Sequence, residues 1–276
     1  MTEPFGQRLW SAVEQWGPLC VGIDPHAELL AAWELPDTAA GAERFGRIVV
    51  DALAGAAAVV KPQSAFFERF GSAGVAALER VLADARAAQL LCITDVKRGD
   101  IGTTAAAYAA AYLDPASPLS SDAITVSPYL GFGSLQPFLD TAAAHGGGVF
   151  VLALTSNPDG PEVQHAVRAD GRTVAGTMLA AVREYNGQTV PQGSVGAVVG
   201  ATIGQTGENL AINGPLLVPG LGAQGGSGSD LERIFAGLGR HVIPSVSREI
   251  LRVGPDRNAL REAAIRAGQE YGRVLG

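Results

Sequence analysis

Short, uninterrupted apolar runs recur along this chain, and amphipathic stretches separate them. Eight of these runs predict strands, which cover residues 19–24, 57–62, 90–97, 123–128, 149–155, 195–201, 215–219 and 241–247. Their apolar residues are continuous rather than alternating with polar ones, which is typical of strands that are covered on both faces. The pattern therefore predicts a parallel sheet buried between other elements.

The amphipathic stretches predict helices that alternate with these strands. They cover residues 41–54, 72–88, 103–113, 134–145, 171–186, 204–211, 228–238 and 257–273, and one more helix precedes the first strand. We expect Ser229 or Asp230 to cap the helix at 228–238. Strict alternation of eight strands and eight helices predicts an α/β protein of the (β/α)8 TIM barrel class, with a doubly wound open sheet as the structural alternative.

One barrel domain is expected to span residues 1–276, a usual length for this fold. Residues 156–172, SNPDGPEVQHAVRADGR, follow the fifth strand and form the longest stretch without periodicity. An irregular stretch of this length inside a compact domain indicates a lid or an insertion.

Composition and charge narrow the classes of partner. Apolar residues make up 47% of the chain and charged residues 17%, so a large core is available. A net charge of −7 argues against nucleic acid and against anionic membranes, although a local cluster of cations can still bind a phosphorylated small molecule. The sequence shows no signal peptide and no apolar run of about 18 residues, so we expect a cytoplasmic protein.

The cysteines and histidines do not predict a metal site. Cys20 and Cys92 each lie in an apolar run, which favours two buried, unpaired thiols. The four histidines are widely scattered along the sequence, and no ligand spacing typical of zinc occurs.

Polar residues gather where the predicted strands end, which is where a (β/α)8 barrel carries its active site. Asp24 ends the first strand, Lys61 the second, Asp95 and Lys97 the third, and Ser127 the fourth. Each alone could be a turn former or a solvated strand end, but together they favour an active site.

The spacing of Asp95 and Lys97 is informative. Residues two apart on a strand point to the same side, so the acid and the base are both expected to face the barrel mouth. Lys61, one strand away, adds a second cation. Such an array can hold opposite charges close together in a partly dehydrated pocket, where their fields are strong.

The stretch PGLGAQGG, residues 219–226, contains the pattern G-x-G-x-x-G at Gly220, Gly222 and Gly225. A dinucleotide-binding fold carries this pattern on an early strand, whereas here only one strand follows it. The position favours the phosphate site that barrels build after their seventh and eighth strands. Gln224 on the loop and Arg248 after the eighth strand are the side chains expected to contact the phosphate.

The stretch DVKRGDIGTT, residues 95–104, resembles the D-x-K-x-x-D signature of the orotidine 5′-phosphate decarboxylase family, in the K-R-G-D-I form of its longer bacterial (type 2) subgroup. Other stretches match that family in the same order: GIDP (22–25), VKPQSAFFERFG (60–71), VSPYLG (126–131), LALTSNP (152–158), VPGLGAQGG (218–226) and PSVSREI (244–250). Together they span most of the chain.

This resemblance implies decarboxylation of orotidine 5′-phosphate to uridine 5′-phosphate, the last step of de novo pyrimidine (UMP) biosynthesis, with no metal or organic cofactor. It also implies a homodimer whose active sites lie at the subunit interface. Four residues match the family's alternating charged tetrad: Lys61, Asp95, Lys97 and Asp100. Lys97 would protonate a carbanion at C6 of the pyrimidine, and Asp95 would lie against the departing carboxylate.

The resemblance also assigns substrate contacts. They fall to Asp24 (ribose hydroxyls), Ser127 (pyrimidine), and Gly220, Gln224 and Arg248 (phosphate). Asp100, with Ile101 and Thr104 beside it, would reach the active site of the partner subunit. Ser247 stands before Arg248 where other branches of the family have glycine.

Three alternatives remain open. A magnesium-dependent enzyme acting on a sugar phosphate, such as a hexulose-phosphate synthase, shares D-x-K-x-x-D. A phosphate-binding barrel without catalysis has no need of alternating buried charges, and an NAD-dependent enzyme would use residues 220–225. Arg98 has no assigned chemistry and is interpreted as an interface or surface salt bridge, whereas Gly99 is expected to let the chain turn toward Asp100.

Overall fold

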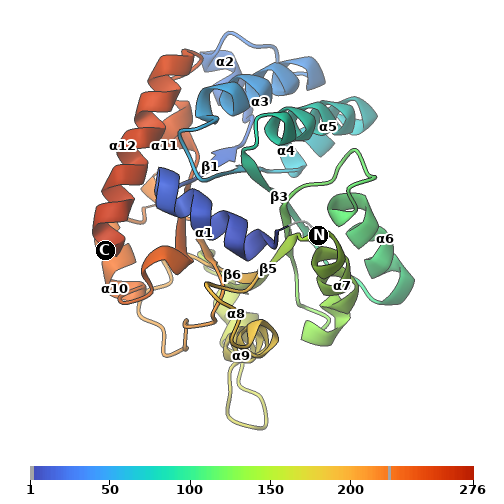
Figure 1. The fold of residues 1–276 in the computed structure, drawn as a ribbon, viewed down its shortest axis with the longest axis vertical. Coiled ribbons are helices and arrows are strands. Elements are labelled where there is room, and N and C mark those ends of the chain that lie inside the picture. Colours follow the sequence, from blue (N-terminus) through green and yellow to red (C-terminus); the bar gives the residue numbers. More distant parts are fainter. Residues whose placement is uncertain (1–2, 223–224) are drawn as a thin grey trace.

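The computed structural model describes residues 3–222 and 225–276, and its centre is a closed barrel of eight parallel strands (Figure 1). The strands are β1 (Cys20–Ile23), β2 (Val59–Pro62), β3 (Leu91–Arg98), β4 (Ala123–Val126), β5 (Gly148–Leu154), β6 (Val195–Val199), β7 (Leu216–Val218) and β8 (Val242–Val246). Each strand pairs with its neighbours in sequence, and β8 pairs back to β1. The (β/α)8 prediction is therefore confirmed, and the open-sheet alternative is wrong.

Helices surround the barrel (Figure 1), and most of them cover the outer faces of its strands. They are α1 (Phe5–Trp16), α2 (Ala27–Ala32), α3 (Ala39–Leu53), α4 (Ala65–Glu68), α5 (Gly71–Ala87), α6 (Gly102–Leu113), α7 (Gln136–His145), α8 (Gly160–Gln164), α9 (Val174–Asn186), α10 (Gly228–Ile234), α11 (Arg248–Leu251) and α12 (Arg257–Leu275), with 3-10 turns η1 (Phe132–Leu135) and η3 (Gly239–His241). All the predicted helices form except the one expected at 204–211.

Residues 204–211 contain no helix, so that prediction is wrong. Short polar side chains there bond to the local backbone instead. Thr206 Oγ1 accepts from the Glu208 N–H at 3.2 Å, and Asn209 Oδ1 accepts from the Ala211 N–H at 2.9 Å. Such bonds offer the backbone an alternative to the helical pattern, and Gly204 with φ +73° also favours a turn.

The cap of α10 also differs from the prediction. Ser227, not Ser229 or Asp230, is the N-cap residue, and its hydroxyl accepts from the Asp230 N–H. Asp230 in turn accepts from the Ser227 N–H at 3.0 Å, which completes a capping box. Asp230 thus contributes to the cap from inside the first turn of the helix.

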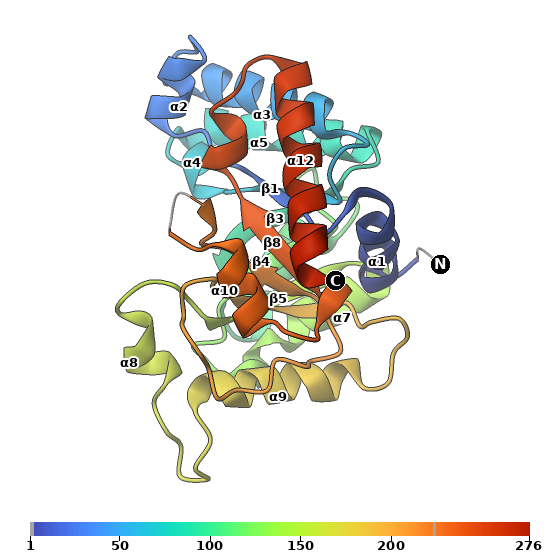
Figure 2. The same cartoon turned by 90° about the vertical axis from the view of Figure 1, so that its left-hand side faces the viewer.

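Helix α1 closes one end of the barrel (Figures 1 and 2). Phe5, Leu9 and Val13 on one face of α1 share a buried cluster with the inward-facing residues of the strands. The ring of Phe5 lies edge-on to Phe150 with centroids 5.9 Å apart. A Cβ atom at Gly148 would come within 2.3 Å of the Phe5 ring, so the close fit of α1 depends on this glycine.

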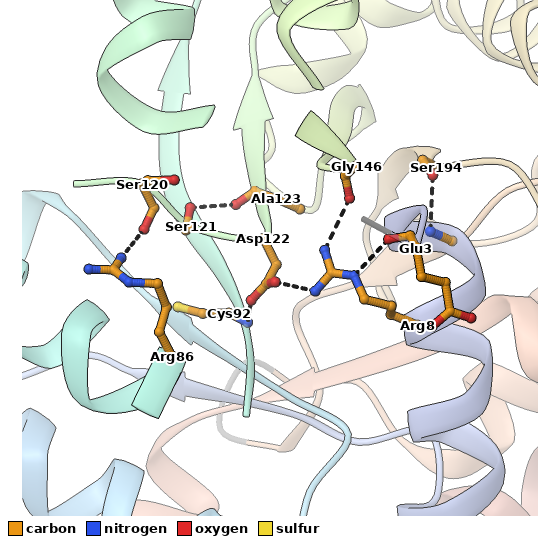
Figure 3. Close-up of polar contacts among 11 residues, drawn as sticks. Glu3, Arg8, Arg86, Cys92, Ser120, Ser121, Asp122, Ala123, Gly146 and Ser194 are labelled. Carbon is orange, nitrogen blue, oxygen red and sulfur yellow. Dashed lines mark hydrogen bonds and ion pairs between the residues drawn. The ribbon is translucent and has the colours of Figure 1, made fainter. Parts of the chain in front are cut away.

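Polar contacts hold α1 against the strands (Figure 3). The Arg8 guanidinium pairs with Asp122, which directly precedes β4, and donates to the Gly146 carbonyl at 3.0 Å. Asp122 also accepts from the Cys92 N–H of β3 at 2.9 Å, so one carboxylate joins α1 to two strands.

Both cysteines are free and buried, as predicted. Burial raises the pKa of the Cys20 thiol to about 11, so this sulfur stays protonated at neutral pH. The region expected to be irregular, 156–172, contains α8 and then extends away from the barrel beside α9 (Figure 2). Within the described residues no helix is both long enough and apolar enough to cross a membrane.

Candidate active site

A cavity of about 520 Å³ is lined by residues at the carboxyl ends of the strands, at the end of the barrel opposite α1. Six of the residues selected from the sequence line it: Asp24, Lys61, Asp95, Lys97, Gly220 and Arg248. They come from β2, β3 and the segments that follow β1, β7 and β8. The closed barrel therefore brings together side chains that are far apart in the sequence.

The centre of the cavity wall is a carboxylate between two ammonium groups. Lys61 Nζ lies 2.9 Å from Asp95 Oδ2, and Lys97 Nζ lies 2.6 Å from Asp95 Oδ1. Lys61 and Asp95 are buried, whereas 46% of the Lys97 side chain is exposed. The predicted meeting of these charges at the barrel mouth is confirmed, and Lys97 is the member with room to meet a ligand.

Strand β3 is irregular where it carries this pair. Its register against β4 shifts between Thr94 and Arg98, and Lys97 has φ +46°, a left-handed conformation that costs a residue with a side chain about 1–2 kcal/mol. The alternation of side chains along a strand thus correctly predicts that the Lys97 side chain faces the cavity, but it does not predict the backbone conformation of Lys97. Strain of this kind is common at functional sites.

The charges stabilise one another despite their burial. Burial alone would raise the pKa of the Asp95 carboxyl, but the charges of Lys61 and Lys97, with hydrogen bonds from Lys97 and Thr125, hold that pKa well below its usual value. Burial would also lower the pKa of the Lys61 ammonium, but the negative charges of Asp95 and Asp24 raise it above its usual value. Asp95 and Lys61 are therefore both charged at neutral pH.

Three polar atoms of cavity-lining residues are buried and have no hydrogen-bond partner in the described part of the chain. They are Asp24 Oδ1, Ser156 Oγ and Ser247 Oγ, and their residues line the cavity. A buried polar atom without a partner costs about 1–3 kcal/mol, so polar atoms of this kind indicate a place where a polar ligand binds.

The glycine loop after β7 forms another wall of the cavity. Gly220 lines the cavity with φ +98°, and its carbonyl accepts from the Gly226 N–H at 2.9 Å. Gly222 has φ +64°, a left-handed conformation that favours glycine. Arg248 lines the same cavity, whereas Gln224, the other residue expected to bind phosphate, lies outside the described residues.

The sequence of this chain was compared with models of known protein families. Residues 17–263 match the model of the Orotidine 5'-phosphate decarboxylase / HUMPS family. This chain belongs to that family. The resemblance found in the sequence is thereby confirmed.

Relatives of the decarboxylase branch match over nearly the whole chain. An orotidine 5'-phosphate decarboxylase of Streptomyces coelicolor is 61% identical over 97% of both chains, and one of a Nocardioides species is 60% identical over 97% of this chain and 98% of its own. A crystal structure from Streptomyces avermitilis, assigned as the same enzyme, has 60% identity and a TM-score of 0.96 over 99% of this chain and 96% of its own. The Leishmania donovani OMP decarboxylase has 32% identity and a TM-score of 0.76, over 99% of each chain.

Four residues selected from the sequence lie away from the cavity lining of this family member. Ser127, after β4, uses its backbone N–H to bond the Arg98 carbonyl at 2.8 Å. Asp100 Oδ1 accepts from the Ile101 N–H at 2.8 Å, while Ile101 and Thr104 lie exposed at the start of α6. The second aspartate of the D-x-K-x-x-D motif therefore does not line the cavity of its own chain.

Gly99 is required for a different reason from the one predicted. Its φ is not positive, but a Cβ atom there would lie 2.5 Å from the Ser127 carbonyl oxygen. The glycine therefore allows the ends of β3 and β4 to approach each other closely, rather than providing a special turn.

Arg98 joins the end of β3 to two helices. Its guanidinium pairs with Glu68 of α4 at 2.6 Å, bonds the Tyr112 hydroxyl at 3.3 Å and lies 5.5 Å from the Tyr108 ring centroid. This agrees with the salt-bridge interpretation of Arg98 and gives the residue a structural role on the side of β3 away from the cavity.

Sequence reasoning missed two cavity residues with clear contacts or exposure to the site. Thr125 of β4 donates its hydroxyl to Asp95 Oδ1 at 2.7 Å. Ser156, two residues after β5, has the partnerless hydroxyl described above. Both residues could have been found from their position in the sequence, because each lies at or near the carboxyl end of a predicted strand, as the charged residues do.

Proposed function

We infer that this chain decarboxylates orotidine 5′-phosphate to uridine 5′-phosphate in the cavity described above. This reaction is the last step of de novo pyrimidine synthesis. The observation that carries the assignment is the buried Lys61–Asp95–Lys97 array, which shares one cavity with Gly220 and Arg248. The array suits a reaction that develops charge on a carbon atom, and the glycine loop with its arginine suits a phosphate. Family membership supports the same reaction.

Lys97 is the proposed proton donor. When the bond between C6 and the carboxylate breaks, CO2 leaves and the electron pair stays on C6 as a carbanion. The Lys97 ammonium, exposed to the cavity, stabilises this charge and transfers a proton to C6. The neutral amine then regains a proton from solvent, so the enzyme returns to its starting state.

Asp95 and Lys61 fix the ammonium of Lys97. The Asp95 carboxylate holds Lys97 Nζ at 2.6 Å and faces the place proposed for the substrate carboxylate. Lys61, buried on the other side of Asp95, balances its charge. Because its pKa lies well below the usual value, Asp95 is anionic at neutral pH.

The remaining cavity residues orient the nucleotide. Asp24 binds ribose hydroxyls, and Gly220 with Arg248 binds the phosphate, together with Gln224. The pyrimidine contact expected for Ser127 is better met by Ser156, because Ser156 lines the cavity and Ser127 does not.

The enzyme is proposed to act as a homodimer. Asp100 lies outside the cavity of its own chain, and the β3–α6 and β4–α7 connections carry exposed apolar side chains. These are Ile101, Tyr129 and Leu130, which are 63%, 79% and 54% exposed. Large exposed apolar side chains favour a protein interface. Asp100, Ile101 and Thr104 would complete the site of the partner subunit.

The test is an ultraviolet assay that follows depletion of orotidine 5′-phosphate by the purified full-length protein, with and without EDTA. We expect the same turnover in both. Binding without turnover would favour a non-catalytic barrel, and turnover lost in EDTA would favour the magnesium-dependent sugar-phosphate branch. Nicotinamide-dependent activity would favour the dinucleotide alternative.

A further inference from the structure

Thr125 connects the acid and the base of the active site. It lies on β4 and faces the cavity, with only 1% of its surface exposed. Its hydroxyl donates to Asp95 Oδ1 at 2.7 Å and accepts from the backbone N–H of Lys97 at 3.0 Å. A backbone N–H can only donate, so the one hydroxyl proton of Thr125 has to go to Asp95.

This hydroxyl occupies the gap in the ladder between β3 and β4. Between two regular ladder pairs, residues 95–97 of β3 stand opposite the single residue Thr125. The backbone of Lys97 leaves the extended conformation there, with φ +46°. Its N–H group cannot make an ordinary ladder bond at this point, and Thr125 Oγ1 takes the place of the missing strand carbonyl.

The two bonds act on the same pair of groups. Asp95 Oδ1 receives both the Thr125 hydroxyl and Lys97 Nζ, at 2.7 and 2.6 Å. Thr125 therefore fixes the carboxylate that holds the ammonium, and also the backbone from which that ammonium extends.

We propose that Thr125 is a positioning residue for decarboxylation, which sets the place of the Lys97 ammonium through the Asp95 carboxylate and the left-handed Lys97 backbone. This inference rests on the proposed function. Thr125 has no role in proton transfer itself, and substrate binding does not depend on its hydroxyl. Its loss should therefore reduce kcat far more than it changes KM.

Four variants separate this role from simple packing. Thr125→Val keeps the size and branching of the side chain and removes both bonds, whereas Thr125→Ser keeps the hydroxyl. Thr94→Val is a matched control on β3: Thr94 is also buried, but it lies outside the cavity lining, and its hydroxyl has no hydrogen-bond partner within the described residues. Thr125→Ala removes the hydroxyl in a smaller side chain if the valine variant does not fold.

Lysine occurs at only two positions, 61 and 97, so the environment of each lysine of the array can be followed by NMR. Protein labelled with 13C at lysine Cε carries two labelled side chains, and Lys61→Arg assigns their signals. If Thr125 positions Lys97, Thr125→Val should move the Lys97 signal more than that of Lys61. General loss of structure would move both and would lower the melting temperature as well.

We expect Thr125→Val to lower kcat about 100-fold, with KM for orotidine 5′-phosphate within about threefold of wild type. Thr125→Ser should recover most of the activity, and Thr94→Val should retain it. A folded Thr125→Val protein with kcat within about threefold of wild type, or with an unmoved Lys97 signal, would overturn the inference. An inactive wild type would refute the proposed function instead, and the lysine signals would then decide alone whether Thr125 positions Lys97.

Discussion

Lys97 Nζ lies 2.6 Å from Asp95 Oδ1, although the backbone between the two residues departs from a regular strand. Asp95 also contacts Lys61, and these are the only two lysines of the chain, so every other basic side chain apart from histidine is an arginine. Both lysines thus serve the cavity. A flexible, compact ammonium suits proton transfer to carbon, whereas the guanidinium of arginine does not release its proton.

Lys97→Ala should remove decarboxylation while sparing the pocket. The variant lacks the proton donor and the cation that stabilises the carbanion, so kcat should fall by at least about 10³-fold. Asp24, Gly220 and Arg248 remain in place, so uridine 5′-phosphate should still bind. Steady-state kinetics and calorimetric titration with the product measure the two effects, and turnover above one tenth of wild type would contradict the proton-donor role.

Asp95→Asn should destabilise the fold and change its response to acid. Removing this carboxylate leaves two buried or half-buried ammonium groups without their shared anion, which should cost about 3–5 kcal/mol of unfolding free energy. Urea unfolding at neutral pH measures that loss.

The sign of the pH effect follows from the lowered pKa of Asp95. The unfolded carboxyl binds a proton more readily than the folded one, so this group stabilises the fold above its ordinary pKa of about 3.9 and less as the pH falls below it. Wild-type stability should therefore decline between about pH 4 and the acid limit more steeply than that of Asp95→Asn. Parallel curves for the two proteins would contradict the low pKa.

Gly99→Ala should separate the ends of β3 and β4. The added Cβ atom would lie 2.5 Å from the Ser127 carbonyl oxygen, a backbone atom that cannot move alone. We expect a loss of about 1–3 kcal/mol in unfolding free energy and a lower kcat, because the shift begins next to Asp100. Gly133→Ala is the control, since nothing lies within 4 Å of a Cβ atom there.

The barrel could be predicted from the sequence because strands covered on both faces carry continuous apolar runs. The helix predicted at 204–211 does not form, because the side chains of Thr206 and Asn209 accept hydrogen bonds from backbone N–H groups two residues further along the chain. The pattern of apolar and polar residues predicts which segments are buried, but it does not predict where side chains compete with the helix for backbone hydrogen bonds.

The charged residues of the site could also be predicted from the sequence, because they interrupt apolar runs. Asp95 and Lys97 are conspicuous at the end of an apolar strand, whereas Thr125 looks like an ordinary strand residue inside the run AITV. The left-handed backbone of Lys97 could not be predicted from the sequence, because such a conformation is usually indicated by glycine and this position is a lysine. Ser127 and Ser156 are equally plausible in the sequence, and only the closed barrel shows which of them lines the cavity.

Arg8→Gln should weaken the fold without affecting the chemistry. Arg8 joins α1 to Asp122 and to the Gly146 carbonyl at the end of the barrel opposite the cavity (Figure 3). Charged hydrogen bonds of this kind contribute about 1.5–3 kcal/mol. Chemical unfolding should show a loss in that range with kcat and KM unchanged, and a change in kcat would show that the two ends of the barrel are coupled.

Mixing two inactive variants should restore activity if Asp100 serves the partner subunit. Lys97→Ala and Asp100→Ala proteins are each expected to be inactive. In a dimer of one subunit of each, one site carries both changes and the other carries neither, so equal mixing with free exchange should recover about a quarter of wild-type activity. If Asp100 served the cavity of its own chain, every site in that mixture would lack one group and no activity would return. The refolded mixture, assayed against each variant refolded alone, thus distinguishes a shared site from a separate one.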